Sequence, residues 1–318
     1  MGPVTAMFGT TGLQVSRIGL GLAALGRPAY INLGHAADLA GHTGEASLER
    51  AAHAVLDAAY ASGVRYFDAA RSYGKAEAFL ASWLAHRGLG PDELVVGSKW
   101  GYTYTADWQV DAPVHEVKDL SPATLRRQIA ESRELLGANL RLYQIHSATL
   151  DSGVLEDQAV LDELARLRDG GLRIGLSVTG PRQAEAIERA LEVEGFDAVQ
   201  ATWNLLERSA GPALSAAHAA GLGVIVKEAL ANGRLTGRGG IRELSEAAER
   251  AGTTPDALAL AGVLAQPWAD VVLSGAATVA ELQSNLAAEA LAPEPGLLDD
   301  LIEDPVAYWK TRAALPWN

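Results

Sequence analysis

Short apolar runs rich in β-branched residues alternate along the chain with longer runs that are rich in alanine and carry regularly spaced charges. The short runs have the length of buried strands, whereas the longer runs repeat their apolar residues with helical spacing. This alternation indicates βα units and a parallel sheet. The strands are predicted at 17–21, 64–68, 94–98, 140–145, 173–177, 198–202, 223–227 and 271–274.

Helices are predicted between these strands, and two of them have recognisable ends. Ser121 followed by Pro122 suits the N-cap and first position of a helix, and Gly170-Gly171 suits the end of another. The helices are expected at 47–61, 75–86, from 122 onward, and at 155–169, 182–193, 212–220, 242–251, 255–264 and 279–291.

Eight strand–helix units most readily close into a (β/α)8 TIM barrel, and a doubly wound open sheet is the alternative. No linker and no change of composition divides the chain, so a single domain over 1–318 is expected. An N-terminal β-hairpin is expected at 7–15. The long loops after the first and third predicted strands, the latter at 100–120, should roof the site at the carboxyl ends of the strands.

Charge and cysteine content narrow the function. The 318 residues carry a net charge of −13 without a basic stripe, which argues against a nucleic-acid partner. The absence of cysteine excludes disulfides, thiolate metal sites and a cysteine nucleophile. Neither a signal-peptide pattern nor an apolar run of about 20 residues is seen, so we expect a cytoplasmic protein without membrane contact.

Three successive strand ends present residues that could carry chemistry. The second strand ends in Asp68 with Tyr73 five residues later, the third reaches Lys99, and the fourth reaches His146. Because the carboxyl ends of barrel strands share one face, these side chains should meet, with Asp68 and Lys99 paired. Taken singly, each has a structural explanation. Asp68 could cap a helix, Lys99 could be solvated, Tyr73 could anchor its loop, and His146 could be a core residue. Together they indicate a catalytic site.

This set of residues suits the reduction of a carbonyl group. Hydride addition builds negative charge on the carbonyl oxygen, and an acid must supply a proton. Lys99 should lower the pKa of Tyr73, Asp68 should orient Lys99, and His146 could donate to the carbonyl. Metal-dependent hydrolysis is the competing class, but only His146 of the seven histidines is well placed, so no metal site is expected.

With these strand ends in view, the chain resembles the aldo-keto reductases over nearly its whole length. Residues 8–16 are similar to the N-terminal hairpin of that family, and 19–21 to its turn beside the nicotinamide. Four residues match the family's catalytic tetrad: Asp68, Tyr73, Lys99 and His146. The resemblance implies NAD(P)H-dependent reduction of an aldehyde or ketone to an alcohol, with Tyr73 as general acid.

The resemblance also implies a cofactor site. Ser177 and Gln200 match residues that hold the carboxamide, and Trp203 lies near the position of the aromatic residue that stacks on the nicotinamide ring in that family. The remaining residues implied in cofactor binding are Gly21, Leu22, Lys227, Leu230, Arg238, Gly275, Ala277, Glu281 and Asn285. Backbone amides and the charge of Arg238 suit the phosphates.

Two departures from the family pattern bear on the cofactor. Val178 stands where an asparagine often follows the serine, so one carboxamide hydrogen bond is lost or supplied elsewhere. Glu281 stands where many relatives have arginine or a neutral residue near the adenosine 2′ position. A carboxylate there would repel a 2′-phosphate and accept from a free ribose. NADPH is favoured from the family's preference, and NADH is possible because of Glu281.

Aromatic residues of the roofing loops and tail are candidates for the substrate pocket. The residues expected to form its apolar wall are Tyr30, Trp100, Trp108 and Trp309, with Tyr102, Tyr104, Tyr308 and Trp317 nearby. Asn32 and His35 could add polar recognition of a small-molecule carbonyl substrate. Two other functions remain open, an NAD-dependent aldose or alcohol dehydrogenase and a cofactor-sensing barrel with slow turnover. A monomer or weak homo-oligomer is expected.

Overall fold

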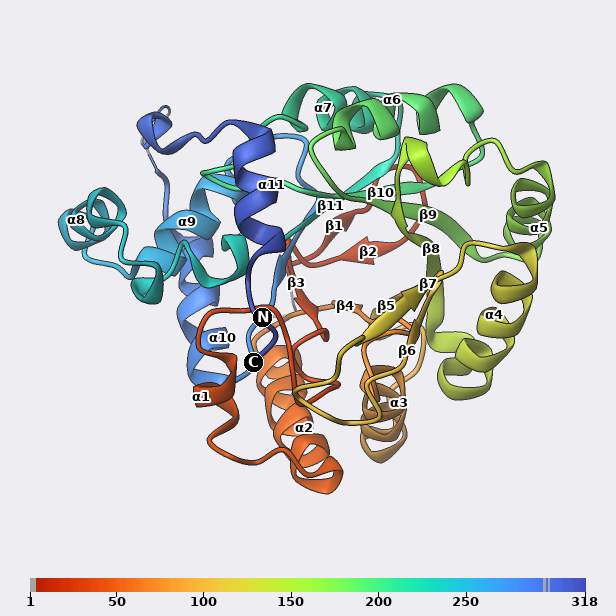
Figure 1. The fold of residues 1–318 in the computed structure, drawn as a ribbon, viewed down its shortest axis with the longest axis horizontal. Helices are drawn as coiled ribbons and strands as arrows, with labels where there is room; N and C mark the ends of the chain where they lie inside the picture. The colour runs from red at the N-terminus through yellow and green to blue at the C-terminus, as the bar shows by residue number, and fades with distance from the viewer. Residues whose placement is uncertain (1–3, 294–295, 297) are drawn as a thin grey trace.

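The computed structural model describes residues 4–293, 296 and 298–318. Eight parallel strands close into a barrel in the order β10-β11-β12-β3-β4-β5-β8-β9 (Figure 1). These strands are β3 (Ile18–Gly21), β4 (Tyr66–Asp68), β5 (Val95–Trp100), β8 (Leu140–Ala148), β9 (Arg173–Val178), β10 (Ala198–Thr202), β11 (Gly223–Lys227) and β12 (Val271–Ser274). Since β12 pairs with β3, the TIM barrel is confirmed and the open sheet is excluded.

Helices surround the barrel close to their predicted positions. Ser121 accepts from the backbone N–H of Thr124 at 3.2 Å and caps the helix that begins at Pro122, as predicted. The helix that begins at Glu45 follows Gly44 and has no side-chain cap. The helices are α1 (His35–Leu39), α2 (Glu45–Ala61), α3 (Ala76–Arg87), α4 (Pro122–Leu136), α5 (Gln158–Asp169), α6 (Gln183–Val193), α7 (Gly211–Ala219), α8 (Arg242–Arg250), α9 (Pro255–Leu264), α10 (Val279–Leu286) and α11 (Pro305–Ala313).

The amino ends of the barrel strands are closed by the N-terminal hairpin, as expected from the sequence. Its strands are β1 (Ala6–Met7) and β2 (Gln14–Val15). The hairpin carries the fully buried Phe8 into the inner core, where its ring lies 6.1 Å from that of Tyr66. A Cβ atom at Gly223 would lie 2.4 Å from the Phe8 ring, so glycine is needed there. The hairpin leaves the opposite end of the barrel, at the carboxyl ends of the strands, open for a ligand-binding site.

The segment predicted as a long loop at 100–120 contains a second hairpin. Its strands are β6 (Tyr102–Tyr104) and β7 (Glu116–Lys118), paired in antiparallel register. The β-prone Tyr-Thr-Tyr sequence of β6 finds its partner only twelve residues later, beyond a long connection that gives no hairpin signal.

The C-terminal segment also has more structure than its sequence indicated. Helix α11 begins with Asp304 as its cap and Pro305 in its first turn. The chain then crosses the carboxyl face and ends beside the loop after β3, near α1 in Figure 1. There the backbone of Asn318 pairs with that of Tyr30 through two hydrogen bonds of 3.0 and 3.2 Å. The tail and the loop after β3 therefore roof this face together.

Candidate active site

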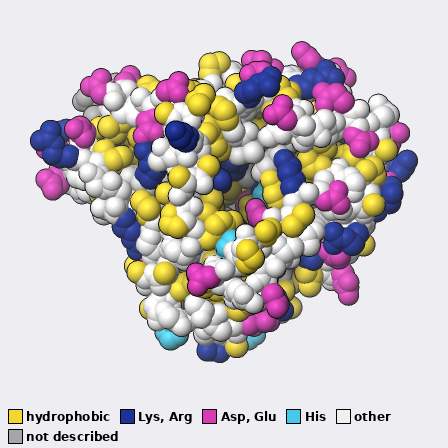
Figure 2. Space-filling model, in the orientation of Figure 1, with side chains coloured by type: hydrophobic (Ala, Val, Ile, Leu, Met, Phe, Trp, Pro, Cys, Tyr) yellow, Lys and Arg dark blue, Asp and Glu magenta, His cyan; other side chains and the backbone are white. Residues whose placement is uncertain are grey.

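A cavity of about 700 Å³ opens at the carboxyl ends of the barrel strands. This volume lies within the range of about 300–1,000 Å³ that is usual for ligand sites. Its wall comes from strand ends, from the loops after β3 and β11, and from the C-terminal tail. Figure 2 shows a hollow near the centre of this face with charged side chains at its rim.

A buried ion pair lies at the floor of the cavity. Lys99 on β5 donates to Oδ2 of Asp68 on β4, and to the carbonyl of Ala69 at 3.0 Å. The side chains of Lys99 and Asp68 are only 1% and 3% exposed. The other oxygen of Asp68 accepts from Tyr66, Gln144 and Gln200, at 3.2, 3.3 and 3.1 Å. The predicted pairing of neighbouring strand ends is confirmed, and the carboxylate is held by four donors.

Tyr73 lies directly above this pair. Its phenol oxygen is 3.5 Å from Nζ of Lys99, and Arg27 lies over its ring at 5.4 Å. Burial, followed by the charge of Asp68, raises the pKa of Tyr73 well above its ordinary value of 10. The pKa is therefore raised and not lowered as expected, because burial and the charge of Asp68 dominate. Tyr73 is thus a firmly protonated phenol.

His146 on β8 completes the group. Its ring packs edge-on against Tyr73 and Tyr102, with centroids 5.5 and 4.9 Å apart. Burial, together with the charges of Lys99 and Lys227, lowers the pKa of His146 well below 6.5. His146 is therefore neutral at pH 7, with one ring N–H to donate.

The structure thus brings together all four residues predicted as catalytic. Asp68, Tyr73 and His146 line the cavity, and Lys99 lies behind Asp68. The arrangement offers a protonated phenol, a neutral imidazole and a fixed ammonium next to one space. It can donate a proton and a hydrogen bond to an oxygen atom that gains negative charge.

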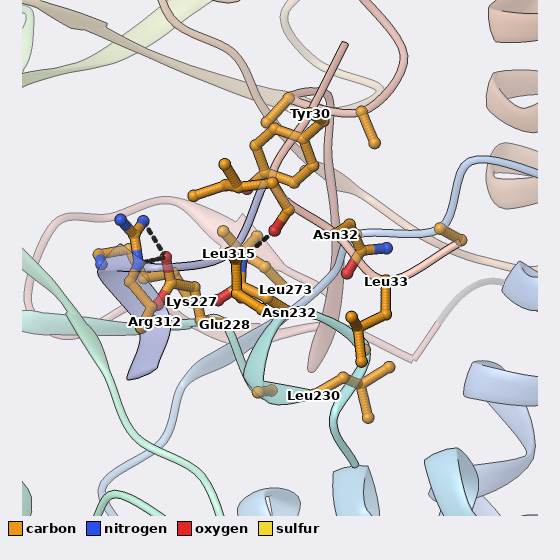
Figure 3. Close-up of a pocket in the computed structure, with 18 of the residues that line it drawn as sticks. Tyr30, Asn32, Leu33, Lys227, Glu228, Leu230, Asn232, Leu273, Arg312 and Leu315 are labelled. Atoms are coloured by element: carbon orange, nitrogen blue, oxygen red, sulfur yellow. Dashed lines mark hydrogen bonds and ion pairs between the residues drawn. The ribbon is translucent and has the colours of Figure 1, made fainter. Parts of the chain in front are cut away.

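Most of the predicted cofactor residues line the same cavity. They are Gly21, Gln200, Lys227, Leu230, Arg238, Gly275, Glu281 and Asn285. Figure 3 shows Leu230 below Asn232 and Leu33 on the wall. The Oδ1 atom of Asn232 is buried without a hydrogen-bond partner in the described part of the chain, and nothing lies within 4 Å of a Cβ built at Gly275. An unused acceptor and an open glycine surface suit a polar, elongated ligand such as a dinucleotide.

Arg238 differs from its predicted role, because its guanidinium is already engaged. It donates to both oxygens of Asp38, at 2.7 Å from Nη1, and to the carbonyl of Leu33 at 3.0 Å. Its Nη1 also lies 3.3 Å from a carboxylate oxygen of Glu281. Asp38 comes from α1, 200 residues away in the sequence. Two carboxylates thus surround the one arginine at this end of the cavity.

Several other predicted cofactor residues lie outside the cavity wall among the described residues. Leu22 is fully buried in the core, and Trp203 packs against Trp268 with ring centroids 5.5 Å apart. Ser177 accepts from the backbone N–H of Ser147 at 2.9 Å, so its hydroxyl fixes a neighbour that does line the cavity. Ala277 donates its backbone N–H to Glu281 at 2.9 Å. The predicted stacking role of Trp203 is therefore wrong in this structure.

Three of the four aromatic residues predicted for the substrate pocket also lie elsewhere. Trp100, the last residue of β5, is completely buried in the main core, and Trp309 packs with Tyr308 in a separate cluster. Trp108 packs against Phe79 and donates to the carbonyl of Thr43 at 2.7 Å. Only Tyr30 of the four lines the cavity. Local sequence cannot tell which side of a loop faces inward, and large aromatic rings gain most from burial.

The cavity wall near Tyr73 is instead formed by other residues. Its side chains include Arg27, Ile31, Tyr102, Glu116, Glu228, Arg312, Leu315 and Trp317. Tyr102 and Trp317 were seen as nearby aromatic candidates, whereas Arg27, Glu228 and Arg312 were missed. Charged residues in loops and on a C-terminal helix give no signal of their own, since each lies far in sequence from its partner.

Comparison with known proteins identifies the family. Residues 17–294 match the model of the aldo/keto reductase family. The chain belongs to the aldo/keto reductase family. This aldo/keto reductase is 27% identical to an uncharacterized oxidoreductase, YrpG, from Bacillus subtilis strain 168, over 92% of each chain. It is 26% identical to an NADH-specific methylglyoxal reductase from Escherichia coli K12, over 88% of this chain and 92% of that one.

Solved structures agree with this assignment. A putative aldo-keto reductase from Pseudomonas aeruginosa is 28% identical and superposes with a TM-score of 0.67, covering 91% of this chain and 96% of that one. An aldo-keto reductase from Bacillus halodurans in its holo form shares the fold, with 19% identity, a TM-score of 0.70 and coverage of 97% and 95%. The chain is therefore an oxidoreductase of a family that uses nicotinamide cofactors. Within the described residues, no helix has the length and apolar character needed to cross a bilayer.

Proposed function

We propose that this enzyme reduces an aldehyde or ketone to an alcohol, with Tyr73 as general acid and NADH as cofactor. The observation that carries the proposal is the convergence of Tyr73, the Lys99–Asp68 pair and a neutral His146 on one cavity. Gln200, Leu230, Gly275 and Asn285 are the residues that would hold the cofactor along the same cavity.

The four residues predicted as catalytic each have a role in protonating the carbonyl oxygen. Bound reduced nicotinamide would supply the hydride that adds to the carbonyl carbon. Tyr73 donates its phenolic proton to the oxygen, and the N–H of His146 donates a hydrogen bond to it. Lys99, 3.5 Å from the phenol oxygen, stabilises the phenolate that remains. Asp68 holds Lys99 in place.

The raised pKa of Tyr73 favours reduction over the dehydrogenase alternative. Reduction begins with a protonated phenol, which is the form that predominates at neutral pH. Alcohol oxidation would begin with the phenolate, which is scarce when the pKa is raised. The same site therefore favours carbonyl reduction when the reduced cofactor is abundant.

The variant Tyr73→Phe tests the acid. It removes only the hydroxyl, so we expect kcat for aldehyde reduction to fall about 10²- to 10⁴-fold. NADH binding, followed by cofactor fluorescence, should remain at the wild-type Kd. Equal turnover by wild type and variant would contradict the role of Tyr73. A wild type that binds NADH but reduces no carbonyl would instead support the cofactor-sensing alternative.

The charges at the far end of the cavity support NADH rather than the NADPH favoured from the sequence. Arg238 is occupied by Asp38 and lies beside Glu281, so little of its charge is left for a 2′-phosphate. Burial raises the pKa of Glu281, and the charge of Asp38 raises it further, since both carboxylates lie beside Arg238. A relative 26% identical carries the name NADH-specific methylglyoxal reductase.

The double variant Asp38→Asn with Glu281→Gln tests this preference. Wild type should bind NADH more tightly than NADPH, measured as Kd by cofactor fluorescence. Removal of both carboxylates frees Arg238. The ratio of the Kd for NADPH to the Kd for NADH should then fall about tenfold, which is equivalent to about 1.4 kcal/mol. Asp151→Asn, an exposed change outside the cavity wall, should leave both constants unchanged. A wild type that prefers NADPH would overturn the assignment.

A further inference from the structure

Three ion pairs lie near Tyr73. Arg27 pairs with Glu116 at 3.1 Å, Lys99 pairs with Asp68, and Arg312 pairs with Glu228 at 2.6 Å. Each positive charge in these three pairs has a carboxylate partner. Lys227, which lines the same part of the cavity, has no carboxylate oxygen within 4.0 Å among the described residues.

Lys227 ends β11, where it is in register with Thr202 of β10. Its ammonium donates to the Thr202 hydroxyl oxygen at 2.8 Å. That is its one hydrogen bond within the described part of the chain. A lysine ammonium carries three N–H donors, so two remain for a ligand or solvent in the cavity.

The neighbouring carboxylate of Glu228 is shared between Lys227 and Arg312. Glu228 accepts from Arg312 through Nε at 3.2 Å and Nη2 at 2.6 Å, and from the Thr202 hydroxyl at 3.2 Å. Although burial by itself raises the pKa of Glu228, Lys227 and Arg312 together lower it to about 2. Figure 3 shows Lys227, Glu228 and Arg312 grouped on one side of the pocket. Two positive charges therefore share the one negative charge of Glu228, which leaves one positive charge in this group unbalanced.

This charge stands out against the rest of the molecule. The chain as a whole carries −13, and the opposite end of the cavity carries the extra carboxylate of Glu281. Burial lowers the pKa of Lys227 to about 8, so the ammonium is still mostly protonated at pH 7. A buried cation without a partner is costly, and a ligand with a negative charge would offset that cost.

We propose that Lys227 binds a carboxylate on the substrate, so that the preferred substrate is an aldehyde or ketone that also carries a carboxylate. This inference rests on the proposed carbonyl reduction, because it places the reacting group beside Tyr73. The substrate's body would lie against Tyr102, Leu315 and Trp317, which give that part of the cavity an apolar wall.

Matched pairs of substrates test the proposal. 4-Carboxybenzaldehyde and 4-formylbenzamide have nearly the same shape and differ in charge, and succinic semialdehyde and its amide form a second pair. Wild type should show kcat/KM about tenfold higher for the acids, mainly through KM. Lys227→Met should abolish the difference, Lys227→Arg should retain part of it, and Lys310→Met, which removes an exposed charge from α11, should leave it unchanged.

Binding without turnover separates this inference from the proposed function. Benzoate and benzamide can be titrated into the NADH complex, with tryptophan fluorescence as the signal because Trp317 lines the cavity. Wild type should bind benzoate about tenfold more tightly than benzamide. Lys227→Met should bind the two compounds equally. Equal binding of the two, or an acid preference that survives in Lys227→Met, would overturn the inference. Absence of any carbonyl reduction alongside selective benzoate binding would count against the proposed function alone.

An effect of Lys227→Met on cofactor binding alone would also overturn the inference that Lys227 binds a substrate carboxylate. If Lys227→Met alters only the ratio of Kd values for NAD⁺ and NADH, the ammonium acts on the nicotinamide ring and not on the substrate. Cofactor fluorescence and competition titrations measure both constants with the same protein samples.

Discussion

In the proposed reaction, Tyr73 is the acid, although its proton is tightly held before the reaction begins. The phenol is enclosed and close to the carboxylate of Asp68, which raises its pKa in the resting site. The ammonium of Lys99, 3.5 Å away, becomes useful only when the proton departs and a negative charge appears beside it. Stabilisation is thus directed to the charged state that forms during the reaction.

His146 gives a pH-dependent prediction at the same scale. Its pKa is lowered in the folded protein, so the unfolded chain binds a proton near pH 6.5 that the folded chain does not bind. The unfolded state is therefore favoured as pH falls below about 6.5, whereas above that pH the effect vanishes. We expect His146→Asn to lose less stability than wild type between pH 7.5 and 5.5, by about 1 kcal/mol.

Urea unfolding at a series of pH values measures this difference. The same substitution at the exposed His86 provides the control, since it removes a histidine without changing the cavity. Parallel losses of stability in wild type and His146→Asn would show that His146 is not kept neutral by the fold.

At the scale of elements, the C-terminal tail fixes the loop after β3. Asn318 pairs with the backbone of Tyr30 and accepts from the N–H of Ala36 at 3.1 Å through its side chain. The same loop is also attached to the loop after β11, because Leu33 donates to the carbonyl of Asn232 at 3.0 Å. Two separate contacts therefore hold the roof over the cavity.

Removal of residues 314–318 should release one contact and leave the other. The amides of Tyr30 and Ala36 lose their acceptors, so we expect both to exchange with deuterium faster, as measured by NMR. The amide of Leu33 is the internal control, because its acceptor lies outside the tail. Unchanged exchange at Tyr30 and Ala36 would mean that the tail does not hold this loop.

At the scale of the whole molecule, closure of the barrel joins distant parts of the chain into one structure. The pairing of β12 with β3 joins residues more than 250 positions apart, at Val272 with Ile18 and Ser274 with Leu20. A closed sheet has no free edge from which part of it can separate. We therefore predict that residues 1–318 form one cooperative unit.

The variant Val272→Ala tests this prediction, since Val272 is completely buried at the closure. We expect a destabilisation on the order of 1–3 kcal/mol from lost apolar contact and the cavity left behind. Far-UV circular dichroism and tryptophan fluorescence should report the same lowered midpoint in urea. Midpoints that separate, or a calorimetric trace with two transitions, would indicate independent units.

The sequence by itself determined the barrel and the position of its chemistry. Alternating strand and helix patterns require parallel strands, and parallel strands place their carboxyl ends on one face. Asp68, Lys99 and His146 therefore had to share that face once their strands were located. This inference needs only local periodicity and chain order, both of which are present in the sequence.

The tertiary structure alone decided which residues complete the site. Trp100 and Trp309 turn into the core while Trp317 reaches the cavity, and Arg238 finds its partner Asp38 from another loop. Such choices depend on which way each loop side chain faces and on ion pairs between distant segments. Neither leaves a periodic signal along the chain, because packing and charge pairing are settled only when the barrel has closed.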